Sequence, residues 1–214
     1  MHDRAESPLR TRQLIHFPII HTPADMGTLD KAVQRATVHK SGVRGWRHKR
    51  RAVEQMWTAI ERILQELPLP FPQVRLYQDG LPVCGKEQEI VNKLARQGSR
   101  NHQLLLDLMQ RGATLEGTES AQLLRQEYAA VKRQLSRSGG SHPARGEDPA
   151  ATGPDSTGIL ARRNRFIAQR INETLRPGET GILFLGMLHH VAEFLEQDIE
   201  ISYPLKPPSN KVTS

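Results

Sequence analysis

The sequence predicts an α/β fold, with a single domain built on a largely parallel sheet that helices flank. Short apolar or alternating runs have the length and residue types of β-strands, and they occur at residues 13–20, 73–78, 180–185 and 199–203. Between them, apolar residues recur at helical spacing. Strands that alternate with helices need crossover connections, and such connections produce parallel pairing. A chain of 214 residues with 37% hydrophobic content can build one such domain with a real core.

The N-terminal part predicts one strand and one long helix. The strand at 13–20 contains Pro18, which would remove a ladder hydrogen bond and therefore favours an edge position or a bulge. Apolar residues then follow helical spacing from Trp46 to Leu67, and Pro68 ends the pattern. We expect a long amphipathic helix over this second stretch.

The middle of the chain predicts two further strands and three helices. The strand at 73–78 runs into Asp79-Gly80, a turn signal. Ser99 is placed to cap the second of the helices, and either Thr118 or Ser120 starts the third. The expected segments in chain order are a helix up to Gly98, a helix from Ser99 to Gly112, a short strand at 113–117 and a helix from about 120 to 135.

Residues 136–157 differ in composition from the rest of the chain. Ser, Gly, Pro, Ala and Asp dominate there, and no apolar periodicity is present. This composition is typical of a disordered insertion. The predicted organisation is a flexible N-terminus at 1–12, one α/β domain at 13–204 that contains this insertion, and a flexible tail at 205–214.

A stretch near the C-terminus, residues 181–191, carries the strongest functional signal. After a predicted helix at 159–175, the apolar run from Ile182 to Leu185 is too short for a helix and ends at Gly186. His189 and His190 follow, and helical spacing resumes at Val191. The pattern predicts a strand, a tight turn and a helix, with the two histidines at the carboxyl end of the strand, where α/β sheets bind ligands.

Charge and composition limit the function classes. The formal charge of +7 suits an anionic partner, but part of the excess lies in segments that look unstructured. The basic run at 47–51 is more typical of a solvated helix face, and aromatic residues make up only 5% of the chain, so nucleic-acid binding is not favoured. A single cysteine excludes an intrachain disulfide, and no apolar run reaches the roughly 18 residues of a membrane span. The expected location is the cytoplasm.

Polar residues follow four of the predicted strands, and parallel strands would bring them to one edge of the sheet. They are His21 with Asp25, then Asp79, then Glu116 and Glu119, and finally His189 with His190. Imidazole and carboxylate groups together bind divalent metals or act as general base and acid without a metal. A structural interpretation stays open for several of them, since Asp79-Gly80 is also a turn sequence and the two glutamates suit a helix N-terminus.

The expected site has two histidines at its centre. His21 and His189 are the expected metal ligands and, with Glu116, the expected catalytic residues. Asp79 and Asp25 are expected contacts to a small-molecule or peptide ligand. The chain contains no His-Glu-x-x-His, Cys-x-x-Cys, Gly-x-Ser-x-Gly, P-loop or dinucleotide glycine motif.

Two segments carry a resemblance to a known superfamily. The sequence Arg162-Arg163-Asn164-Arg165-Phe166-Ile167-Ala168-Gln169-Arg170-Ile171, followed by the strand and Gly-x-x-His at 181–189, resembles the C-terminal part of the TraB/Tiki and erythromycin-esterase/ChaN-like superfamily. The strand leading to His21 is similar to that superfamily's N-terminal strand and histidine. The resemblance implies a pocket in which His21 and His189 face each other beside an acidic residue and an arginine. It therefore adds Arg163 and Arg165 to the expected contacts to the ligand. Members include metal-dependent peptidases, a metal-independent esterase and haem-associated proteins.

The leading hypothesis is therefore a hydrolase whose strand-end histidines bind a divalent metal or activate water. The rival is a binding or regulatory protein that keeps the same fold without catalysis.

Overall fold

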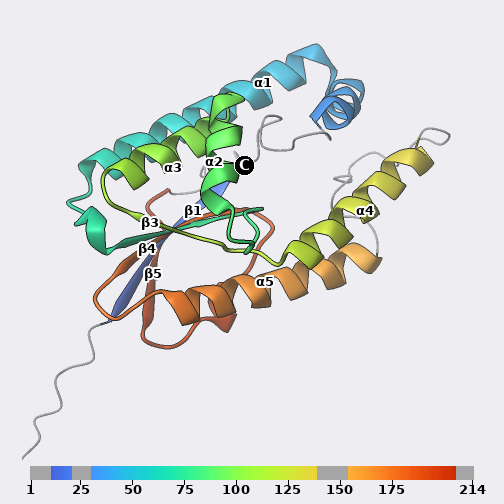
Figure 1. Cartoon of the computed structure of the whole chain (residues 1–214). Coiled ribbons are helices and arrows are strands. Elements are labelled where there is room, and N and C mark those ends of the chain that lie inside the picture. The colour runs from blue at the N-terminus through green and yellow to red at the C-terminus, as the bar shows by residue number, and fades with distance from the viewer. Residues whose placement is uncertain (1–10, 21–29, 139–153, 206–214) are drawn as a thin grey trace, which may run out of the picture.

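A five-stranded, all-parallel sheet forms the centre of the molecule, which is a single domain (Figure 1). The computed structural model describes residues 11–20, 30–138 and 154–205. The strand order is β3-β2-β4-β1-β5. The strands are β1 (Arg12–Ile19), β2 (Val74–Gln78), β3 (Thr114–Glu116), β4 (Thr180–Gly186) and β5 (Ile199–Ser202). The predicted fold class is confirmed.

Helices cover both faces of this sheet (Figure 1). One face carries α1, α2 and α3, and the other carries α5, with α4 packed beside α5. The α-helices are α1 (Asp30–Glu66), α2 (Glu87–Arg96), α3 (Arg100–Gln110), α4 (Ala121–Ser138) and α5 (Pro154–Thr174). Two 3₁₀ turns, η2 (Phe71–Gln73) and η3 (Ala192–Phe194), lie in the connections.

The alternation of side chains along each strand divides the core into two layers. In β4, Ile182 and Phe184 pack with the α1 layer, whereas Leu183 and Leu185 pack with α5. Consecutive strand residues point to opposite faces, so an uninterrupted apolar strand must be covered on both sides. This explains why β4 has no polar residue between Gly181 and Gly186.

The position of β1 differs from the edge position that Pro18 favoured. β1 lies between β4 and β5, and it pairs with β4 along its length up to Ile19. Arg12 donates its backbone N–H to the β5 side, so in the alternating pattern of a parallel strand Pro18 also faces that side. Pairing with β5 ends at Ile15, so no ladder hydrogen bond is lost at Pro18.

The structure differs from the sequence predictions at the start of α1, at the ends of the insertion and in the segment after β4. α1 begins at Asp30 rather than near Trp46, because residues 30–45 contain few large apolar residues and so lack the apolar periodicity that predicts a helix. The ends of the predicted insertion at 136–157 are helical, since α4 continues to Ser138 and α5 begins at Pro154, while residues 139–153 lie outside the described residues. After β4 the chain forms only the 3₁₀ turn η3, because the short connection that crosses β1 to reach β5 leaves no room for a helix.

Candidate functional site

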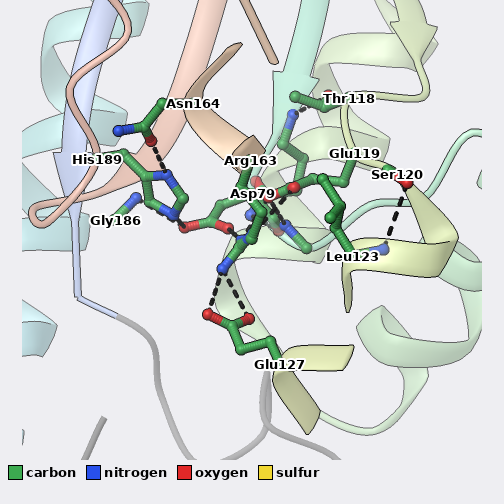
Figure 2. A network of polar contacts seen from close by, with 12 residues as sticks. Asp79, Thr118, Glu119, Ser120, Leu123, Glu127, Arg163, Asn164, Gly186 and His189 are labelled. Atoms are coloured by element: carbon green, nitrogen blue, oxygen red, sulfur yellow. Dashed lines mark hydrogen bonds and ion pairs between the residues drawn. The ribbon is translucent and has the colours of Figure 1, made fainter. Parts of the chain in front are cut away.

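Three side chains that follow three neighbouring strands meet at the carboxyl end of the sheet (Figure 2). Asp79 directly follows β2, Glu119 lies in the loop after β3, and His189 lies in the turn after β4. One ligand atom from each lies within 4.8 Å of the others, and all three side chains are buried. We call Asp79, Glu119 and His189 the rim cluster.

The topology explains why the rim cluster forms here. β2 and β4 are hydrogen-bonded neighbours, yet the chain leaves β2 toward the α1 layer and leaves β4 toward the α5 layer. Such a divergence opens a crevice at the carboxyl ends of adjacent strands, which is where α/β sheets place ligands.

Backbone hydrogen bonds fix the loops after β2 and β3 to each other. The Thr118 hydroxyl accepts from the backbone N–H of Gln78 at 2.9 Å. The backbone N–H groups of Thr118 and Glu119 both donate to the carbonyl of Leu81, at 3.0 and 2.9 Å. Because the two loops are joined in this way, the Glu119 carboxylate is held beside the strand end that carries Asp79.

The turn after β4 places His189 against Asp79. The His189 N–H donates to the Gly186 carbonyl at 3.0 Å, which closes the turn. The Gly186 N–H donates to Asp79 Oδ2 at 2.8 Å, so the same carboxylate binds the start of the turn. His189 Nε2 lies 3.7 Å from Asp79 Oδ2, and Nδ1 lies 2.6 Å from Asn164 Oδ1.

Arg163 of α5 joins the carboxylates (Figure 2). Its Nη2 lies 2.8 Å from Asp79 Oδ1 and 2.5 Å from Glu119 Oε1, and its Nε lies 3.1 Å from Glu119 Oε2. Its Nη1 contacts both oxygens of Glu127 of α4 at 2.7 Å. A planar guanidinium can bind several carboxylates at once because its five N–H groups point outward in one plane. Arg163 therefore links α4, α5 and the two strand-end loops.

Negative charge is in excess around Arg163. The buried carboxylates of Asp79 and Glu119 already outnumber the one guanidinium, and the half-exposed Glu127 adds a third. Burial raises the pKa of Glu119 to about 7, and the neighbouring Asp79 acts in the same direction against the opposing effect of Arg163. Burial alone would lower the pKa of Arg163, but the bonds and charges of its three carboxylate partners hold it above the usual value. The arrangement favours an additional proton or cation.

Other predicted site residues lie outside the rim cluster. Glu116 is the last residue of β3, and it forms ion pairs with Arg75 and Arg170. The exposed Arg165 guanidinium lies 5.5 Å from the ring centroid of Phe194. His21 and Asp25 lie outside the described residues.

The three side chains of the rim cluster have little contact with solvent. Two surface hollows among the described residues lie on α2 and between α1 and α3, away from the rim cluster. The side chain of Glu119 is completely buried.

Sequence reasoning placed Glu116 among the catalytic residues and did not select Glu119, Glu127 or Asn164. A usable signal existed for Glu119, because it lies past its strand, as Asp79 and His189 do, whereas Glu116 lies within its strand. Glu127 and Asn164 lie on helices, and nothing in their spacing points to the sheet edge.

No protein-family model, curated protein or solved structure matches this chain. Among the described residues, no helix is long and apolar enough to cross a membrane.

Proposed function

We propose that the rim cluster binds a divalent metal ion and that the protein is a hydrolase that uses this metal. The observation that carries the proposal is the meeting of Asp79, Glu119 and His189 within 4.8 Å, from three separate loops. Buried carboxylates in excess of their arginine partner are costly unless a further positive charge balances them. A divalent cation supplies that charge.

The ligand types indicate the class of metal. Two carboxylates and one imidazole suit zinc, manganese or iron(II), because these metals accept mixed oxygen and nitrogen ligands. Three protein ligands leave a coordination position for water, and a bound metal lowers the pKa of such water toward neutrality. The resemblance to the TraB/Tiki and erythromycin-esterase/ChaN-like superfamily supports the same proposal, since Arg163 and His189 are among the residues that carry it. His21 stays a predicted additional ligand.

One observation favours a second candidate, which is hydrolysis without a metal. Arg163 contacts both oxygens of Glu119, so a metal must share or displace these contacts. A carboxyl group whose pKa is about 7 can also exchange protons near neutral pH, as a general acid or base requires. In this alternative Glu119 and His189 act on water or substrate directly.

Metal content of the purified protein tests the proposal. The wild type is saturated with zinc or manganese, desalted and analysed by mass spectrometry beside Asp79→Asn, Glu119→Gln and His189→Gln. We expect about one tightly bound metal per chain in the wild type and a large loss in each variant. His190→Gln is the matched control, because His190 is the exposed neighbour of His189. Equal binding by His189→Gln and the wild type would contradict a site at the rim cluster.

Activity assays distinguish a metal-dependent hydrolase, a metal-free hydrolase and a non-catalytic binding or regulatory protein. Chromogenic esters and peptide anilides are offered to the metal-loaded and to the chelator-treated protein. Hydrolysis that the chelator abolishes and metal restores supports the metal-dependent enzyme. Hydrolysis that survives the chelator but is lost in Glu119→Gln supports the metal-free mechanism. Metal binding with no turnover on either panel supports a binding or regulatory protein.

A further inference from the structure

We propose that Asn164 is a positioning residue that holds His189 in the tautomer with the proton on Nδ1, so that the Nε2 lone pair faces the rim cluster. This inference rests on the proposed metal site and assigns a role there to a residue outside the rim cluster, whose side chain is hydrogen-bonded to that of His189. It is drawn from the contacts on each side of the imidazole ring (Figure 2).

The first contact defines the donor. Asn164 Oδ1 lies 2.6 Å from His189 Nδ1, and both side chains are buried. A carbonyl oxygen can only accept a hydrogen bond, so Nδ1 carries the hydrogen. A neutral imidazole has one N–H, and therefore Nε2 is left with a lone pair.

The second contact shows which group the Nε2 lone pair faces. His189 Nε2 is the nitrogen that faces Asp79, 3.7 Å from Oδ2. A lone pair and a carboxylate oxygen do not attract each other, but both can bind the same cation. Histidines that bind metals usually donate their other N–H to an oxygen acceptor, which fixes the ring and raises the basicity of the ligand nitrogen. The Asn164 amide has the position of that acceptor.

The helix explains how one element serves both parts of the site. Arg163 and Asn164 are consecutive in α5, and successive side chains on an α-helix diverge by roughly 100°. Arg163 reaches the carboxylates of Asp79 and Glu119, while Asn164 reaches the imidazole of His189. α5 thus sets the positions of all three members of the rim cluster.

The tautomer can be observed directly. Long-range ¹H–¹⁵N correlation spectra, recorded at about pH 8 so that imidazoles are neutral, distinguish the two tautomers of each histidine. The chain has nine histidines, and the His189 signals are those missing from His189→Gln. We expect the Nδ1–H form in the wild type and in Asn164→Asp, whose carboxylate also accepts from Nδ1. In Asn164→Leu we expect a shift toward the Nε2–H form.

Zinc affinity supplies a second readout. Competition titrations with a chromogenic chelator should show binding weakened about 10- to 100-fold in Asn164→Leu. In Asn164→Asp the affinity should stay within a few-fold of the wild type. A purely structural role for Asn164 would lower stability in Asn164→Leu without changing the tautomer.

The outcomes separate this inference from the proposed function. An Nε2–H tautomer in the wild type overturns the role of Asn164 even where zinc binds. An unchanged Nδ1–H tautomer in folded Asn164→Leu overturns it too. A tautomer that depends on Asn164 in a protein that takes up no zinc supports the role of Asn164 and refutes the metal site. Should Asn164→Leu fail to fold, the wild-type tautomer and that of Asn164→Asp still decide the question.

Discussion

Arg163 is the residue on which the charges of the site depend. Its guanidinium is buried and contacts two buried carboxylates, so its removal would leave them without their cation. A buried ion pair contributes little compared with an apolar replacement, but breaking one by removing a single partner is strongly destabilising. The neighbouring Arg162 is exposed on the same helix, and its Nη1 lies at a long 3.4 Å from Gln126 Oε1.

We therefore expect Arg163→Gln to lower the free energy of unfolding by about 3–5 kcal/mol at neutral pH. Arg162→Gln is the matched control and should change it by less than about 0.5 kcal/mol. Urea denaturation followed by circular dichroism measures both. A loss below about 1 kcal/mol in Arg163→Gln would show that the carboxylates are neutral or hydrated in the native state.

A second buried titratable residue lies away from the site. His16 of β1 is buried beside the ring of Tyr203, and its Nε2 has no hydrogen-bond partner among the residues that the structure describes. Burial lowers the pKa of His16 from 6.5 to about 4. The unfolded chain thus binds a proton below pH 6.5 that the folded chain accepts only near pH 4, so acid favours unfolding across this window.

His16→Leu should remove this acid sensitivity. Between pH 7 and 4, the wild type should lose up to about 3 kcal/mol relative to the variant, because each pKa unit corresponds to about 1.4 kcal/mol. Urea titrations of both proteins at several pH values provide the difference. A stability difference that stays constant from pH 7 to 4 would show that His16 is protonated to the same extent in both states.

At the scale of elements, the central strand β4 is packed closely against its neighbours at Gly181. A Cβ at Gly181 would lie 2.7 Å from Leu14 Cδ1 and 3.2 Å from Tyr77 Cε2, and both of these side chains are buried. By contrast, a Cβ at Gly158 of α5 would meet nothing within 4 Å.

The two glycines should respond in opposite directions to alanine. Gly181→Ala should destabilise the protein by about 1–3 kcal/mol through overpacking. Gly158→Ala should stabilise it by roughly 0.5–1 kcal/mol, because alanine favours the helix. Chemical denaturation of the two variants tests the pair, and a neutral Gly181→Ala would mean that the Leu14 side chain moves aside at little cost.

Sequence patterns predicted those elements that pack on the core. The apolar run of β4 and the helical spacing of α5 reflect burial of these side chains in the core. The cap at Ser99 reflects the need of a helix N-terminus for a hydrogen-bond acceptor. The first part of α1 was not predicted, because its sequence contains few large apolar residues. The interior position of β1 was also missed. Pro18 favoured an edge position, and the sequence does not show that pairing with β5 ends at Ile15, before it reaches Pro18.

At the scale of the whole molecule, the site arises from the order of the strands. Sequence reasoning expected Asp79 and His189 at one edge of the sheet, and the structure places both there. It selected Glu116 instead of Glu119, although Glu119 lies past its strand, and the contact that distinguishes the two carboxylates is the one between Glu119 and Arg163. Asn164 was found only through its contact with His189.

Because the rim cluster exists only in the folded sheet, a bound metal should stabilise the whole domain. At a free zinc concentration about 100 times the dissociation constant, the gain is roughly 2.7 kcal/mol. This corresponds to a rise of about 5–10 °C in the melting temperature. Differential scanning fluorimetry should show the rise in the wild type and in His190→Gln but not in His189→Gln. An equal rise in all three would place the zinc elsewhere.

The insertion of β1 between β4 and β5 has a consequence for synthesis of the chain. A ribosome releases β1 first, yet both strands that pair with it are made last. Until Thr180 and the residues after it emerge, the apolar β1 has two unpaired edges in the nascent polypeptide. A ribosome-stalled chain that ends before β4 should therefore be cut readily by protease and retained by chaperones. Protection should appear only once β5 has left the exit tunnel.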